Sequence, residues 1–247
     1  MSGRLCAGTS GWHYAHWRGV FYPEDLPPAR WLAYYAQRFP CVEINNAFYR
    51  LPSEQAVQQW AREVPAHFRF AVKASRYITH VKRLRDCAEA VSRFLARMNG
   101  LGDYLGPVLF QLPGHWRPNL ERLADFLELL PEDLATAFEF RDPRWHTAET
   151  VDLLAAYGAA FCVYHAGEER SPLWITAPFA YVRMHGPLGW YQGEYGRDGL
   201  AWLTRWLQEV RPRVERAYVF FNNDAVGWAI RDALALRALA DPVPDAG

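Results

Sequence analysis

The sequence predicts an irregular (β/α)8 barrel, an α/β fold in which parallel strands alternate with helices. Three observations predict it. Short β-rich runs alternate with amphipathic segments, eight such runs fit into 247 residues, and no linker or low-complexity segment divides them. We therefore expect one barrel domain over residues 1–240, followed by a flexible tail with two prolines over residues 241–247.

Each expected strand is a run rich in β-branched and aromatic residues. In chain order the runs cover residues 5–10, 41–45, 68–74, 108–112, 135–141, 160–165, 180–185 and 217–222.

The segments between most strands have the apolar spacing of helices. One stripe consists of Leu120, Leu123, Leu127 and Leu130, and another of Leu200, Leu203, Trp206 and Val210. Helix starts are indicated by Pro27-Pro28 before Trp31, Pro52-Ser53 before Val57, and Asn222-Asn223-Asp224 before Trp228. Residues 166–179 show no helical pattern, so we expect a loop in place of the sixth crossover helix.

Composition excludes several classes of protein. The 27 basic and 27 acidic side chains cancel, so net charge gives no support to nucleic-acid or membrane-surface binding. No apolar run is long enough to span a membrane, and the first residues lack a signal peptide's apolar region. Four widely spaced cysteines are typical of buried, reduced thiols. These features predict a cytoplasmic protein.

Polar residues gather at the carboxyl ends of the expected strands, where barrel enzymes have their active sites. Side chains alternate along a strand, and the apolar set must face the helices, so the polar set faces the barrel interior. This set comprises Glu43, Asn45, Lys73, Gln111, Glu139, Arg141, Arg183, His185 and Asn222. A polar network that only plugs the barrel mouth is the alternative.

The inward charges favour an anionic ligand, because Lys73, Arg141 and Arg183 outnumber Glu43 and Glu139. The glycine-rich loop over residues 186–196 and the helix expected to begin at Asn222, Asn223 and Asp224 could add backbone amides. Asp224 is itself an anion at that position, unless it caps the helix.

Aromatic residues also follow the strands. Of 11 tryptophans, several lie in loops together with tyrosines, and such rings stack on a sugar or a base when they border a pocket. The loop set is Trp12, Tyr14, Trp17, Tyr49, Trp145, Trp190 and Tyr191, with Trp12, Tyr49 and Tyr191 as expected substrate contacts. The alternative is that these rings bury the loops.

Other chemistries have weaker support. Phosphate-binding, dinucleotide, hydrolase and zinc-protease motifs are absent. No cofactor is expected, although a divalent metal is conceivable from His165, His185, Glu43, Glu139 and Asp224, with neighbouring cations competing for the carboxylates. Glu43 and Glu139 as a glycosidase pair is a further alternative. His80 and Ser10 lack evident partners for a nucleophilic triad.

Several motifs, in order along nearly the whole chain, resemble those of the DUF72 (YecE-like) family. They are Gly8-Thr9-Ser10-Gly11-Trp12, Val42-Glu43-Ile44-Asn45, Phe48-Tyr49-Arg50-Leu51-Pro52, Phe70-Ala71-Val72-Lys73, Leu109-Phe110-Gln111-Leu112-Pro113, Glu139-Phe140-Arg141, Tyr181-Val182-Arg183-Met184-His185-Gly186 and Phe220-Phe221-Asn222-Asn223-Asp224. The resemblance implies an irregular TIM barrel, and by fold analogy with apurinic endonucleases and sugar isomerases it suggests phosphodiester or sugar chemistry. His165 stands where many members have Asp, which weakens a metal role there.

The leading hypothesis is therefore an enzyme, a hydrolase or an isomerase or lyase, that acts on a small phosphorylated, carboxylated or sugar-like anion. Glu43 or Glu139 would act as acid or base, Lys73, Arg141 and Arg183 would bind the oxyanion, and His185 would carry protons. The alternatives are a metal-dependent, endonuclease-like phosphodiesterase and a non-catalytic ligand-binding module.

Overall fold

The computed structural model describes residues 3–241 and divides the chain into two compact units. Unit 1 comprises Met1–Val42, Val163–Arg170 and Pro178–Gly247, and unit 2 comprises Glu43–Cys162 and Ser171–Ala177. Strands β2 (Cys41–Ile44) and β6 (Ala160–Ala166) begin in one unit and end in the other. The expected tail lies, from residue 242 onward, outside the described residues.

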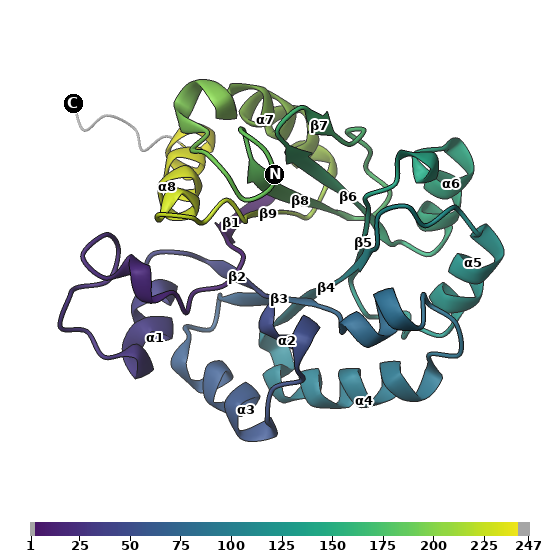
Figure 1. Cartoon of the computed structure of the whole chain (residues 1–247), viewed down its shortest axis with the longest axis horizontal. Helices are drawn as coiled ribbons and strands as arrows, with labels where there is room; N and C mark the ends of the chain where they lie inside the picture. Colours follow the sequence, from purple (N-terminus) through teal and green to yellow (C-terminus); the bar gives the residue numbers. More distant parts are fainter. Residues whose placement is uncertain (1–2, 242–247) are drawn as a thin grey trace. The chain divides into compact units, whose positions relative to one another are not determined.

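Unit 1 is built on parallel strands β1 (Arg4–Thr9), β8 (Phe179–Gly186) and β9 (Arg216–Phe221), with β9 between the other two. Helix α8 (Trp228–Ala240) packs on β1 and on α7 (Gly196–Val210), and both helices lie outside these strands (Figure 1). A short helix, α1 (Trp31–Ala36), follows the loop after β1.

The expected loop in place of the sixth crossover helix is confirmed. Residues 167–178 contain no helix, and their one regular element is the two-residue strand β7 (Glu169–Arg170). This strand pairs antiparallel with the end of β6, through His165 opposite Arg170. The sequence did not indicate it.

Unit 2 is built on parallel strands β3 (Arg69–Lys73), β4 (Leu105–Leu112) and β5 (Thr136–Phe140), and β5 pairs with the start of β6. Helices lie outside these strands (Figure 1). They are α2 (Asn46–Tyr49), α3 (Glu54–Glu63), α4 (Ala88–Met98), α5 (Leu120–Glu128) and α6 (Ala148–Ala156).

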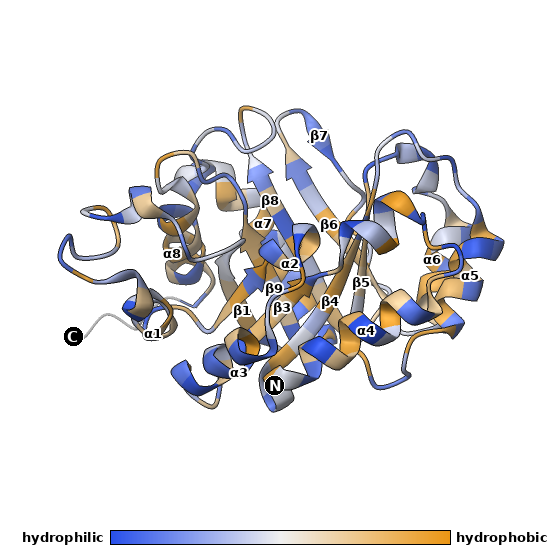
Figure 2. Ribbon diagram, turned by 60° about the horizontal axis from the view of Figure 1, so that its bottom comes forward, coloured by the Kyte–Doolittle hydropathy of each residue, from blue (hydrophilic) through white to orange (hydrophobic). Residues whose placement is uncertain are grey.

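Side-chain caps begin several of these helices where the sequence places polar residues. Ser53 accepts a hydrogen bond from the Ala56 amide at the start of α3, and Asn119 accepts one from the Arg122 amide at the start of α5. Helix α4 alternates between orange and blue, as an amphipathic helix does, whereas strands such as β4 and β5 are largely orange (Figure 2).

The predicted fold class is confirmed as a TIM-like α/β barrel. The eight predicted strands are present, in the pairing order β1-β9-β8-β6-β5-β4-β3-β2, with helices or turns between successive strands. The four cysteines are buried and free, as the sequence predicts. The helix after β9 is a correction, because α8 begins at Trp228 and not at Asn222–Asp224.

Most loop tryptophans belong to the core. Trp17 and Trp145 are fully buried and Trp12 nearly so. In unit 1, Tyr22 stacks on Trp31 with ring centroids 4.8 Å apart, so the loop after β1 is fixed by aromatic packing. Trp12 therefore fits the alternative in which the rings bury the loops. Tyr49 and Tyr191 instead keep large exposed fractions, 81% and 46%.

Candidate functional site

Four charged side chains of unit 2 lie at the carboxyl ends of its strands. Glu43 and Glu139 are fully buried and Lys73 is 9% exposed. Arg141, which follows β5, is 21% exposed and donates a hydrogen bond from Nε to Oε1 of Glu139 at 2.8 Å. Burying an unpaired charge costs on the order of several kcal/mol. The two buried carboxylates are therefore stable here because cations lie among the same strand ends.

An aromatic contact connects this group to the loop after β3. The Nζ atom of Lys73 lies 4.0 Å from the ring centroid of Phe48, in α2. The ring of His80 meets the same Phe48 ring edge-on at 5.1 Å. Phe48 therefore touches both a cation and an imidazole.

Positive charge surrounds His80. Its pKa is lowered to about 4, first by burial and then by Lys73, Arg76, Arg141 and Arg83. This value lies below the 6.5 of an ordinary histidine, so the folded protein disfavours protonated His80. Its contribution to stability therefore falls as the pH drops from about 6.5 towards 4. The sequence analysis did not select His80, although cations recur through residues 76–85 around it.

The other expected residues of unit 2 have different environments. Gln111 is buried and donates from Nε2 to the Leu112 carbonyl at 2.7 Å. Asn45 precedes α2, and its buried Oδ1 has no hydrogen-bond partner among residues 3–241. Asn45 thus offers an unused acceptor close in sequence to Phe48.

In unit 1, several expected residues meet at the end of β8. Arg183 and His185 are buried, at 1% and 0% exposure. Nδ1 of His185 lies 3.2 Å from Nδ2 of Asn222, and its ring centroid lies 5.9 Å from that of Tyr191. Of the inward-facing set, His185 and Asn222 are thus in contact with each other.

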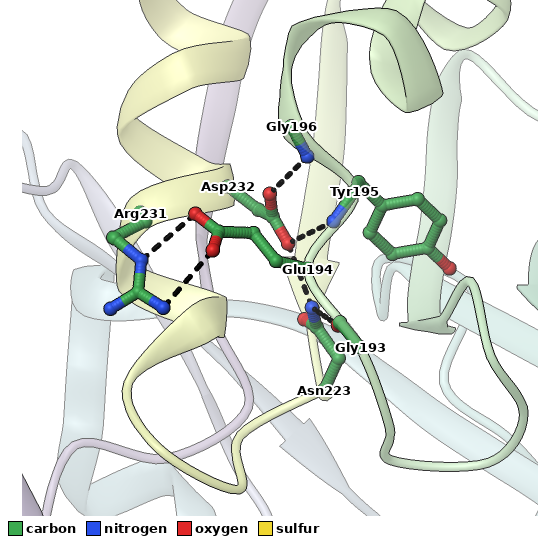
Figure 3. Close-up of polar contacts among 7 residues, drawn as sticks. All are labelled: Gly193, Glu194, Tyr195, Gly196, Asn223, Arg231 and Asp232. Atoms are coloured by element: carbon green, nitrogen blue, oxygen red, sulfur yellow. Dashed lines mark hydrogen bonds and ion pairs between the residues drawn. The ribbon is translucent and has the colours of Figure 1, made fainter.

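The glycine-rich loop after β8 already has a carboxylate at its amides (Figure 3). Asp232, buried in α8, accepts hydrogen bonds at 3.0 Å from the amides of Tyr195 and Gly196. Nδ2 of Asn223 donates to Asp232 at 2.7 Å and to the Gly193 carbonyl at 2.8 Å. Burial raises the pKa of Asp232 despite these donors. The amides of Tyr195 and Gly196, which the sequence offered to an anionic ligand, thus bind the carboxylate of Asp232.

Asp224 anchors the loop after β1 and does not cap a helix. Its Oδ2 accepts hydrogen bonds from Nε2 of His16 and Nε1 of Trp17, each at 2.8 Å. Its side chain is 7% exposed, and burial raises its pKa. Ionised Asp224 can only accept hydrogen bonds, so Nε2 of His16 carries the proton when Asp224 is ionised. The sequence analysis missed His16, because it lies six residues beyond its strand.

The metal alternative gains no support. Over residues 3–241, His, Cys, Asp and Glu side chains form no group of three or more arranged to hold a metal ion. His165, one of the conceivable ligands, has its Nδ1 atom 2.9 Å from the Tyr195 hydroxyl.

Within the same part of the chain, no helix has the length and apolarity needed to cross a membrane.

Comparisons with known proteins agree with the motifs. The family model "Protein of unknown function DUF72" matches residues 6–245. The UPF0759 protein YunF of Bacillus subtilis is 26% identical over 95% of this chain and 94% of its own length. The UPF0759 protein YecE of Escherichia coli is 37% identical over 45% of this chain, and the match spans only 41% of YecE.

Solved structures give the same result. A DUF72 family protein from Thermotoga maritima has a TM-score of 0.86 and 31% identity over 96% of this chain and 98% of its own. A DUF72 family protein from Enterococcus faecalis, at 20% identity, has a TM-score of 0.84 over 98% of this chain and 97% of its own, which supports the fold. The chain belongs to the DUF72 family.

Proposed function

We propose that the protein is an enzyme that binds a small anionic substrate at the carboxyl ends of β3 and β5 and acts on it by acid–base chemistry. Lys73 and Arg141 bind the anion, and Glu43 or Glu139 transfers the proton. One observation carries the proposal: burial, and after it the charges of four cations, lower the pKa of His80 to about 4. The part of this shift that comes from Lys73, Arg76, Arg141 and Arg83 indicates a positive potential at the imidazole.

A positive potential in a half-buried place favours an anion more strongly than the same charges in water would, because solvent screens them less. The substrate would be a phosphate, a carboxylate or a sugar phosphate. Arg141 can present guanidinium N–H groups to such oxygens while its Nε remains on Glu139. Its 21% exposure leaves it accessible to a ligand.

The acid–base part rests on Glu43 and Glu139. Both are fully buried at strand ends, where barrel enzymes position catalytic groups. Glu139 is held by Arg141 at 2.8 Å, so its carboxylate has a fixed position relative to a bound anion. A carboxylate in that place can take a proton from the substrate and return it.

Separate tests of binding and turnover examine the proposal. Inorganic phosphate should raise the unfolding temperature at constant ionic strength, because it binds only the folded protein. Glu43→Gln and Glu139→Gln should retain this effect, since each removes a negative charge beside the anion. In a panel of phosphate esters, sugar phosphates and carboxylates, one of the two variants should lose turnover by about 100-fold or more.

Two results would contradict the proposal. An unfolding temperature that phosphate and sulfate leave unchanged would remove the anion site. Binding without turnover of any compound in the panel would leave a ligand-binding module instead of an enzyme. Arg93→Gln is the matched control for both measurements, because Arg93 is an exposed cation on α4 of the same unit.

A further inference from the structure

We infer that the anion recognised by unit 2 is the backbone of single-stranded nucleic acid. The inference rests on the proposed function, because the anion that Lys73 and Arg141 bind would be one phosphate of a longer chain. It starts from residues 75–87, the segment after β3, which we call the basic loop. This loop carries four cations and one acid: Arg76, Lys82, Arg83, Arg85 and Asp86.

These cations are concentrated locally in a protein whose net charge is zero. Arg76, Arg83 and Arg85 are exposed. Among residues 3–241, Arg85 is the one of these three with an ion pair, to Asp86 at 3.4 Å, and both side chains are more than 70% exposed. Such an exposed pair is worth less than about 1 kcal/mol and can be exchanged for a phosphate.

The basic loop is electrostatically continuous with the anion site. Arg76 and Arg83 belong to the loop, Lys73 and Arg141 belong to the strand ends, and all four lower the pKa of His80. A single phosphate group can contact only some of these four cations at once. A chain of phosphodiesters, with one negative charge per nucleotide, matches several cations along the loop.

An exposed aromatic side chain borders the same charges. Tyr49 is 81% exposed, and its ring lies 5.0 Å from the ring of Phe48, which also contacts Lys73 and His80. Tyr77, in the basic loop, is 45% exposed. A base stacks on such a ring only when it is unstacked from its neighbours, which selects a single strand over a duplex.

The backbone of the basic loop has an unusual, fixed shape. Residues Tyr77–Val81 form a π-helical turn, and Arg83, Leu84 and Asp86 have φ values of 49°, 64° and 49°. Residues other than glycine adopt such φ angles at a cost of about 1–2 kcal/mol each. Segments of this kind cluster at binding sites, which agrees with a loop shaped to present its cations.

Fluorescence anisotropy with a labelled single strand of about 12 nucleotides, of mixed sequence, tests the inference. Binding should weaken steeply between about 50 and 200 mM salt, with a slope of log affinity against log salt near −2 to −3 for three or four phosphate contacts. Tyr49→Ala should weaken binding about tenfold through lost stacking. Arg76→Gln should reduce the salt slope by about 0.7.

Matched controls and further ligands decide the outcome. Tyr157 is an exposed tyrosine just after α6, and Arg93 is an exposed arginine of α4, so Tyr157→Ala and Arg93→Gln should leave binding unchanged. Equal affinity for a mononucleotide, or tighter binding of a duplex, would overturn the inference. So would binding insensitive to both Tyr49→Ala and Arg76→Gln. If no oligonucleotide binds while inorganic phosphate still stabilises the protein, the inference fails and the proposed function stands.

Discussion

Asp232→Ala is expected to lower the free energy of unfolding by about 3 kcal/mol. The substitution leaves two backbone amides and the Asn223 side chain without the carboxylate that accepts from them at 2.7–3.0 Å. Buried donors that lose their acceptor cost about 1–3 kcal/mol each, less what water can replace. Urea denaturation at pH 7 measures the effect.

The neighbouring residue supplies the control. Arg231 forms an ion pair with Glu194 at 2.8 Å, with the two side chains 44% and 39% exposed (Figure 3). Arg231→Ala should therefore cost less than about 1 kcal/mol. Asp232→Asn should fall between the two, because an amide keeps one acceptor oxygen. Equal costs for Asp232→Ala and Arg231→Ala would show that the buried carboxylate does not organise this loop.

Gly186→Ala is expected to cost at least about 3 kcal/mol. A Cβ atom at this position would lie 2.2 Å from the Gln192 carbonyl oxygen and 2.6 Å from that of Gly189. The φ angle of +133° adds strain for any side chain, of order 1–3 kcal/mol. The glycine is required by the packing of the loop on itself.

Two other glycines separate strain from steric overlap. Gly189 has a φ of +129° and open space around its Cβ position, so Gly189→Ala measures strain alone. Gly114 has open space at its Cβ position and no positive φ, so Gly114→Ala should change the free energy of unfolding by less than about 0.5 kcal/mol. In thermal or urea unfolding, the loss of stability should be largest for Gly186→Ala, intermediate for Gly189→Ala and smallest for Gly114→Ala. Any other order contradicts the loop geometry.

The spacing of apolar residues and the turn residues between them were sufficient to locate the strands in the sequence. Strands buried in a parallel sheet need apolar runs, and such runs are easy to recognise. They missed features set by local geometry. Strand β4 begins at Leu105, three residues before the predicted run of residues 108–112. The antiparallel strand β7 has two residues, too few for any pattern. The π-helical turn has no sequence signature.

Strand parity identified charged side chains that are buried, such as Glu43, Lys73 and Glu139. It could not find His80, His16 or Asp232. These residues lie in a loop, in a short turn and in a helix, and each gains its role from partners distant in sequence or from the surrounding charge. Asp232, which follows Arg231 in a stretch whose other residues from Ala229 to Leu236 are apolar, was the one available signal, since a buried carboxylate requires donors.

The pKa of His80, followed by NMR of its ring protons, tests the central claim most directly. Without anions His80 should stay neutral as the pH is lowered to 5, with a pKa of about 4. Phosphate should raise this pKa, because a bound anion cancels part of the field from Lys73 and Arg141 and stabilises the imidazolium. Lys73→Met should raise it without phosphate and weaken the phosphate effect. Titration near 6.5, with no response to saturating phosphate, would contradict the account.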